Sequence, residues 1–436
     1  MTRSTILSGA AALVVALALG YAVARPDTDG AVRAVAEAVA PDAEPEDAPG
    51  FLYGRVVATD GSHYQGRLRW GGGEEAFWSD TFIGIKDENP WAADTPLADR
   101  VRPPELFGIA VPWAAPEVDL ARPFMARFGD IARIESLGDG VRGVVRDGAD
   151  FDPTVRVVLK SGAVVDLDRL SSSDFDDGVR VWDRRGVVDL GPGRIRSIEF
   201  LPTVPLAGVP RRLHGTVHTP EGTFTGVLQW DRAGWVGSDR LVGRSEDGDV
   251  SLRFDAIRSL SHRSGGILAT LRDGREVALS GPRPAGVTVD DPRYGRVRVS
   301  WGTLERVDLR SGDSGPGYDA FPTGRLLRGR VTTRDGRRLA GRLVYDLDES
   351  ETTETLDAPA GGVDYTIPFG RVRSIVLSNG ASAEVTLDGG EVLALERRGD
   401  LGPGNAGLLV LADDDSGSEY VPWPDVQRIE VEPSGG

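Results

Sequence analysis

The chain has 436 residues, a formal charge of −17 and 40% hydrophobic residues. This length exceeds what one hydrophobic core serves and fits about three domains, and the apolar content is that of a folded protein. The negative charge disfavours nucleic acid and anionic membrane surfaces as partners, because both would repel the chain. The absence of cysteine excludes disulfides, thiolate metal sites and cysteine nucleophiles.

Residues 1–24 predict a secretory signal peptide or an uncleaved membrane anchor. Arg3 precedes an apolar run at residues 6–19, and Ala22 and Ala24 end the stretch. A positive start, an apolar core and an Ala-x-Ala end are typical of a signal peptide. The run to Ala24 is also almost long enough to span a bilayer. In either case we expect the remainder to be exported, and to be periplasmic or anchored to the inner membrane facing the periplasm.

Residues 25–50 predict a disordered acidic linker, because they are rich in Ala, Pro, Asp and Glu. Beyond it, one phrase occurs three times: LYGRVVATDGSHYQGRLRW from Leu52, LHGTVHTPEGTFTGVLQW from Leu213 and LRGRVTTRDGRRLAGRLVYD from Leu327. In each copy apolar or small residues alternate with polar ones, which is the period of a β-strand. Turn residues such as Asp335 and Gly336 interrupt the alternation, so each copy predicts a β-hairpin.

Each hairpin leads to a second recurring phrase, an aromatic followed at intervals of three by two aliphatics. The copies are Phe128/Ile131/Ile134, Phe254/Ile257/Leu260 and Phe369/Val372/Ile375. This spacing predicts a 3₁₀ turn that leads into a strand. Another hairpin follows, with turns at 161–162, 273–274 and 389–390, and the aromatic phrase returns at Trp301 and Trp423.

These patterns predict an all-β protein of three tandem repeats, each built from two halves. The predicted repeats are 51–205, 206–310 and 323–433, and a Gly/Ser linker at 311–322 separates the last two. A half-repeat would bury only a marginal core, so we expect the two halves of each repeat to pack together.

The hairpin of the third copy resembles the first motif of Sm-like proteins and, more broadly, of SH3-like small barrels. The turn at Asp335, Gly336 and Arg337 is followed by Gly341, Leu343 and Asp346 at the spacing of that motif. The resemblance implies that each repeat is a pair of small SH3/Sm-like barrels, whose closure hides strand edges. It implies no RNA binding, because the asparagine expected after Asp346 and the Arg-Gly motif of the Sm family are missing.

The first repeat carries an insertion at about 85–127 that is dense in proline. Prolines cannot donate to a strand ladder, so this segment predicts a long irregular loop. Its aromatic residues, which stack on sugars or anchor peptides in other proteins, are the candidate ligand contacts: Trp91, Phe107, Trp113 and Phe124. In the alternative interpretation, these rings fasten the loop onto the barrel.

Three motifs suggest chemistry, and we interpret each as structural. GDSGPG at 312–317 resembles a serine-protease nucleophile motif, but it lies in the linker and has no histidine in the surroundings that family requires. His214 and His218 share the predicted solvent face of a strand, where the other copies have mostly Tyr, Arg and Thr. The acidic runs at 174–177 and 413–415 lack the spacing of a calcium-binding EF-hand loop. We therefore expect no cofactor, no metal and no catalytic residue.

The sequence thus favours an exported, non-enzymatic cell-envelope protein that presents β-barrel modules for protein–protein interaction. The alternative is a glycan- or peptidoglycan-binding protein that uses the aromatic insertion. The expected partner is an envelope protein or cell-wall glycan, with no nucleic acid. Hydrolysis would require a pair of carboxyl groups about 5–10 Å apart in a groove.

Overall fold

The computed structural model describes residues 45–137, 155–167, 175 and 177–433, with internal gaps at 72, 87–88, 98–104, 107–108, 111–121, 232–233, 247, 264–265, 282–283, 313, 379 and 414–416. The chain divides into two units, Met1–Ala43 and Glu44–Gly436, and all described residues belong to the second. The predicted segment at 1–24 and most of the predicted linker at 25–50 lie outside the described residues. Within the part described, no helix is both long enough and apolar enough to cross a membrane.

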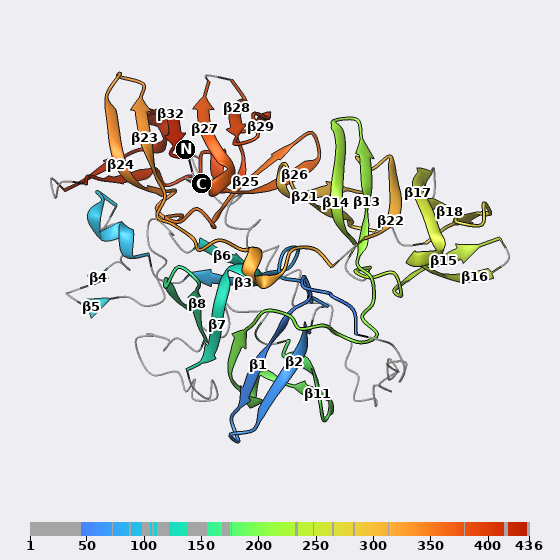
Figure 1. The fold of residues 1–436 in the computed structure, drawn as a ribbon. Helices are drawn as coiled ribbons and strands as arrows, with labels where there is room; N and C mark the ends of the chain where they lie inside the picture. Colours follow the sequence, from blue (N-terminus) through green and yellow to red (C-terminus); the bar gives the residue numbers. More distant parts are fainter. Residues whose placement is uncertain are drawn as a thin grey trace. The chain divides into compact units, whose positions relative to one another are not determined.

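The described residues form an all-β protein of three repeats, as predicted, and each repeat has ten equivalent strands (Figure 1). Those of the first repeat are β1 (Tyr53–Ala58), β2 (His63–Trp70), β3 (Thr81–Lys86), β6 (Arg122–Arg127), β7 (Ile131–Ser136), β8 (Val155–Leu159), β9 (Val164–Leu167), β10 (Val179–Asp183), β11 (Gly186–Leu190) and β12 (Ile195–Phe200). Those of the second are β13 (Leu213–Thr219), β14 (Gly222–Trp230), β15 (Arg240–Ser245), β16 (Gly248–Arg253), β17 (Ile257–Arg263), β18 (Gly266–Leu271), β19 (Glu276–Leu279), β20 (Gly286–Asp291), β21 (Gly295–Ser300) and β22 (Arg306–Ser311). Those of the third are β23 (Arg328–Thr333), β24 (Arg338–Tyr345), β25 (Thr355–Ala360), β26 (Val363–Pro368), β27 (Val372–Leu377), β28 (Ser382–Leu387), β29 (Val392–Glu396), β30 (Leu408–Leu411), β31 (Ser418–Val421) and β32 (Val426–Val431).

The two halves of each repeat share one antiparallel sheet. In the first repeat its order is β11-β10-β2-β1-β12-β7-β8-β9, and the third repeat follows the same order from β31 to β29. The last strand of the first repeat, β12, pairs with β1 on one side and with β7 on the other. The final strand therefore joins the two halves, while β3 and β6 form a separate hairpin.

The second and third repeats are continuous through a strand edge. Strand β21, the edge of the second repeat, pairs with β26 of the third, which extends the sheet to ten strands (Figure 1). In this pairing Val297 lies opposite Tyr365 and Arg298 lies opposite Asp364. The equivalent hairpin of the second repeat, β15 and β16, forms a two-stranded sheet of its own.

The predicted turns form where the spacing of aromatics placed them. The 3₁₀ helices η2 (Phe128–Asp130), η4 (Phe254–Ala256) and η6 (Phe369–Arg371) each precede a strand, and η8 (Trp423–Asp425) does so in the second half of the third repeat. At Trp301 the chain forms a turn and no 3₁₀ helix. The hairpin glycines Gly61 and Gly336 have φ of 85° and 89°, a conformation that other residues rarely adopt.

The buried faces of the strands build the core. Alternate strand residues are buried, and the aromatics that open η2, η4, η6 and η8 are enclosed among them. The first repeat has its own apolar cluster, whereas the apolar residues of the second and third repeats form one cluster. Strand pairing between β21 and β26 explains why the last two repeats share a core.

The insertion of the first repeat contains more regular structure than its prolines predict. It includes the 3₁₀ helix η1 (Pro90–Asp94) and two short strands, β4 (Glu105–Leu106) and β5 (Ile109–Ala110). The prediction of an irregular loop is wrong for β6, which pairs along its length with β3. Pro123 is tolerated there because β6 is the edge of a two-stranded sheet, where an N–H group is dispensable.

Candidate functional site

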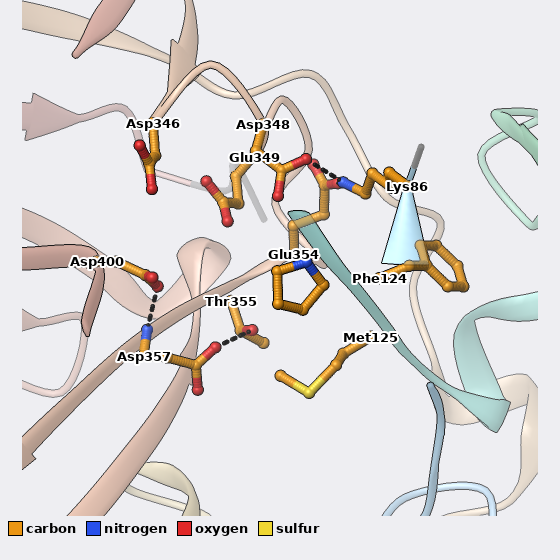
Figure 2. Close-up of a pocket in the computed structure, with 11 residues that line it drawn as sticks. Lys86, Phe124, Met125, Asp346, Asp348, Glu349, Glu354, Thr355, Asp357 and Asp400 are labelled. Atoms are coloured by element: carbon orange, nitrogen blue, oxygen red, sulfur yellow. Dashed lines mark hydrogen bonds and ion pairs between the residues drawn. The ribbon is translucent and has the colours of Figure 1, made fainter. Parts of the chain in front are cut away.

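A small pocket lined with carboxyl groups lies where the β3–β6 hairpin of the first repeat contacts the third repeat (Figure 2). Its cavity measures about 60 Å³. Of the eleven lining residues, six are acidic and one is basic. They are Lys86, Pro123, Phe124 and Met125 from the hairpin, and Asp346, Asp348, Glu349, Glu354, Thr355, Asp357 and Asp400 from the third repeat.

The loop between β24 and β25 supplies most of these acids and begins with strained backbone. Asp346 and Leu347 have φ of 51° and 54°. Aspartate tolerates this left-handed region, but for leucine it is uncommon and costs energy. The conformation is held from the insertion, because Asn89 Nδ2 donates to the Leu347 carbonyl at 2.7 Å and the Leu347 side chain is fully buried. Strain maintained in this way is typical of functional sites.

Comparison of the repeats identifies the acids that serve the fold. The carboxylate of Asp346 accepts a hydrogen bond from Ala406 N, which precedes β30. In the second repeat, Asp231 has the same left-handed φ and accepts from Ala285 N at 3.0 Å, ahead of β20. Asp346 therefore stabilises a turn that also occurs in the second repeat.

Glu354 also has a structural counterpart in every repeat. Its Oε2 accepts from Ser350 N and Glu351 N, at 2.6 and 2.9 Å. Asp80 and Asp239, which occupy the same position ahead of β3 and β15, each accept from two successive backbone N–H groups. This acid closes the loop that leads into the hairpin.

Two further acids of the pocket, Asp348 and Asp357, have no acidic counterpart in the other repeats. The bonds of Trp230 N to the Gly234 carbonyl and of Tyr345 N to the Glu349 carbonyl align the loops of the second and third repeats. At the positions of Asp348 and Asp357, the second repeat has Ala233 and Val242 and the first has Gly73 and Ile83, whereas Glu349 matches Glu74 of the first repeat. A surplus of negative charge that the fold itself does not require points to binding.

Lys86 is the only basic residue among those that line the pocket. Its Nζ lies 2.6 Å from Asp348 Oδ1 and 2.9 Å from Glu354 Oε1. Burial alone would lower the pKa of Lys86, but the carboxylates of Glu354 and Asp348 outweigh burial and hold this pKa above its usual range. The ammonium group is therefore charged, and its single positive charge is shared between two of the six carboxylates.

Glu349 lacks such compensation. Its Oε2 is enclosed and meets no hydrogen-bond donor among the described residues. Burial, followed by the charges of Asp348 and Asp400, raises the pKa of this carboxyl well above its usual range. Figure 2 shows the carboxyl groups of Asp346, Glu349 and Asp400 facing a common space.

Asp357 and Asp400 form the far side of the pocket. Asp400 Oδ2 accepts from Asp357 N at 2.6 Å, and Asp357 accepts from the hydroxyls of Thr355 and Thr366. Burial raises the pKa of both carboxyls, and in Asp400 the charge of Asp357 adds to the effect. As long as no external cation is bound, these two carboxyl groups therefore remain protonated at pH values at which ordinary carboxyl groups are ionised.

The structure describes two of the four predicted ligand contacts. Phe124 is 3% exposed and lines the acidic pocket. Trp91 is half-buried on η1, packs against a buried cluster that includes Val344 and Leu409 of the third repeat, and has the Arg342 guanidinium 4.9 Å from its ring centroid. Phe107 and Trp113 lie outside the described residues. Trp91 thus fastens the insertion onto the third repeat, and Phe124 contributes to a site of different chemistry.

Two of the motifs interpreted as structural make local contacts among the described residues, whereas most of the acidic runs at 174–177 and 413–415 lies outside them. Ser314 Oγ accepts a hydrogen bond from Gly50 N at 3.0 Å, so it connects the linker at 311–322 to the residue that precedes the first repeat. His218 Nε2 lies 2.9 Å from Asp308 Oδ2 on a partly exposed strand face. Among the described residues, no three His, Cys, Asp or Glu side chains are placed to hold a metal ion.

Reasoning from the sequence missed Lys86 and the acids of the third repeat. The available signal was the run from Asp346 to Asp357, whose density of acids the equivalent segments of the other repeats lack. Lys86 offered a weaker signal as one of only two lysines in the chain. Comparisons with protein-family models, with curated proteins and with solved structures found no match. The fold and the pocket therefore define this chain only by class, as an all-β repeat protein with an acidic pocket.

Proposed function

We propose that this chain is a non-enzymatic cell-envelope protein whose repeats bind a partner protein, and that the acidic pocket receives a basic side chain of that partner. The observation that carries the proposal is the lining of the pocket, in which six carboxyl groups surround a single ammonium group. Buried negative charge without compensation is costly and attracts cations. A cationic group supplied from outside would relieve that cost.

The dimensions of the pocket favour the head of a side chain over a larger ligand. About 60 Å³ accommodates roughly four to six water-sized groups, enough for an ammonium or guanidinium head. Phe124 and Met125 line one side, and such a surface suits the methylene stem of lysine or arginine. A pyranose ring with its hydroxyl groups is larger than this cavity.

The contacts of three of the six carboxyl groups favour holding a cation over moving protons. Asp346 and Glu354 are bound to backbone N–H groups, and Asp348 to Lys86. Groups that are fixed in this way hold a charge in place but have no free proton to transfer. The glycan-binding alternative depends on Phe107 and Trp113, which lie outside the described residues. The proposed export of the chain depends on residues 1–24.

Titration calorimetry tests the proposal with a short peptide that contains one lysine and with the same peptide acetylated on that lysine. We expect the lysine peptide to bind and the acetylated peptide to bind at least about tenfold more weakly, because acetylation removes the charge. Glu349→Gln should weaken binding of the lysine peptide by about tenfold, since it removes the uncompensated carboxylate. Glu384→Gln, at an exposed position of β28 in the same repeat, is the matched control and should change nothing. Equal binding of the two peptides, or no effect of Glu349→Gln, would contradict the proposal.

A further inference from the structure

Lys86 belongs to a different repeat from the carboxylates that bind it. It is the last residue of β3 in the first repeat, whereas Asp348 and Glu354 belong to the loop ahead of β25 in the third. The side chain is 17% exposed, and Figure 2 shows it entering the pocket from the side opposite Asp346 and Asp400. The pocket therefore already holds one ammonium group, delivered by the chain itself.

The residues around Lys86 indicate which kind of ligand the pocket binds. Two carboxylates bind a primary ammonium group at hydrogen-bond distance, and the neighbouring residues of β6 form an apolar wall. These are the features that the proposed function assigns to an external lysine. An external ammonium placed among Glu349, Asp357 and Asp400 would share the pocket with Lys86, and two like charges in a partly enclosed site repel each other.

Resting on the proposed function, we propose that Lys86 is an internal ligand of the acidic pocket, which occupies one ammonium position and competes with the basic side chain of the partner. Lys86 thereby sets the affinity of the site. Its removal creates a pocket with a larger uncompensated negative charge, which binds an external ammonium more tightly.

The contact between the hairpin and the third repeat does not depend on Lys86 alone. Asn89 donates to the Leu347 carbonyl, and Ala92 packs with Leu347 and Leu409 in a buried cluster. A Lys86→Met variant keeps most of the length of the side chain and leaves these contacts in place, so we expect it to fold. Lys160→Met is the matched control, because Lys160 is the other lysine of the chain, donates to the Tyr318 carbonyl and is not among the residues that line the pocket.

Calorimetric titration of the full chain with the single-lysine peptide tests the competition. Lys86→Met should bind the peptide at least about tenfold more tightly than the unmodified chain, and Lys160→Met should bind it with unchanged affinity. Equal or weaker binding by a folded Lys86→Met variant would overturn the competition. If neither the unmodified chain nor Lys86→Met binds, the proposed function fails, and the competition fails with it.

Chemical rescue tests the internal-ligand assignment separately from any partner. Lys86→Ala removes the ammonium and its stem from between Asp348 and Glu354, and n-propylammonium reproduces the missing group. We expect millimolar n-propylammonium to raise the Tm of Lys86→Ala in a saturable manner, with no such effect on Lys160→Ala. Absence of rescue would overturn the assignment whether or not the peptide binds.

Discussion

At the scale of single residues, the acidic pocket contains acids that stabilise the fold and acids that destabilise it. Asp346 and Glu354 repeat the roles of Asp231 and Asp239 and satisfy backbone N–H groups. Glu349 satisfies no donor among the described residues through its enclosed Oε2. A residue that costs stability without a structural return is typical of a binding site, because binding needs groups that the fold leaves uncompensated.

Glu349→Gln should therefore stabilise the protein while it weakens binding. The folded pKa of Glu349 is raised above the ordinary value of 4.5, so the favourable contribution of the protonated form is complete below that value and is lost as the pH rises through the folded pKa. Glutamine keeps the shape without the charge, so we expect a gain of about 1 kcal/mol in unfolding free energy at pH 8 and little change at pH 4. Urea unfolding at both pH values measures the difference, and a loss of stability at pH 8 would contradict the expectation.

Some of these residues could be identified from the sequence. The density of acids between Asp346 and Asp357 is visible once the three copies are aligned, because the second copy has Gly234 and Val242 at the positions of Glu349 and Asp357. The pairing of Lys86 with Asp348 was not accessible. It joins residues 262 positions apart, and no local pattern encodes which repeat the hairpin will contact.

At the scale of elements, the sequence predicted what is paired locally. Hairpins such as β23 and β24 follow from alternation around a glycine turn, and the 3₁₀ helices follow from the spacing of three. The strand β6 was missed, because its partner β3 precedes it by the whole insertion and its proline argued against a strand. Local chemistry thus gave the elements of the repeat but not the partner of a strand that lies after a long loop.

The pairing of β21 with β26 also has a local electrostatic basis. Arg298 lies opposite Asp364, and opposite charges across a strand pair are favourable. At the equivalent positions, β11 of the first repeat has Asp189 and β16 of the second has Asp249. Pairing of β11 with β16 in the same register would place two like charges opposite each other, which is consistent with the separate sheets of the first two repeats.

Reversing the charge at Arg298 tests this account. Arg298→Asp should destabilise the protein by about 0.5–1 kcal/mol, because both side chains are exposed and their interaction is modest. Adding Asp364→Arg should recover most of that loss, since the pair is then restored in the opposite orientation. Thermal unfolding of the two single variants and the double variant gives the coupling energy. Additive effects in this cycle would show that the cross-strand charges are independent.

At the scale of the whole molecule, the junction between the first and second repeats is made by buried polar groups. Arg212, 2% exposed, donates Nη1 to Asp80 Oδ2 at 3.3 Å and Nη2 to Ser79 Oγ. Arg296 of β21 donates to Thr81 Oγ1 at 3.1 Å. Loss of one partner of a buried ion pair leaves a buried charge without compensation, so this junction depends on paired charges, unlike the apolar core that the second and third repeats share.

We expect Asp290 to make the junction sensitive to pH near neutrality. It is 8% exposed on β20, and burial raises its pKa to about 7, with Asp80 adding to the rise and Arg296, Arg212 and Arg127 opposing it. The folded pKa thus exceeds the ordinary value of 3.8. The stability contributed by the protonated carboxyl is complete below pH 3.8 and is lost as the pH rises through about 7.

Asp290→Asn should remove this dependence, because the amide remains neutral at every pH. For the unmodified chain we expect the Asp290 contribution to fall by up to about 4 kcal/mol between pH 4 and pH 8. Urea unfolding across that range measures the slope, which should be clearly smaller in Asp290→Asn. Asp249→Asn, at an exposed position of the second repeat, is the matched control and should retain the slope of the unmodified chain. Identical slopes for the unmodified chain and Asp290→Asn would mean that the junction is stabilised by its arginine pairs independently of Asp290, and that neutral pH does not loosen it.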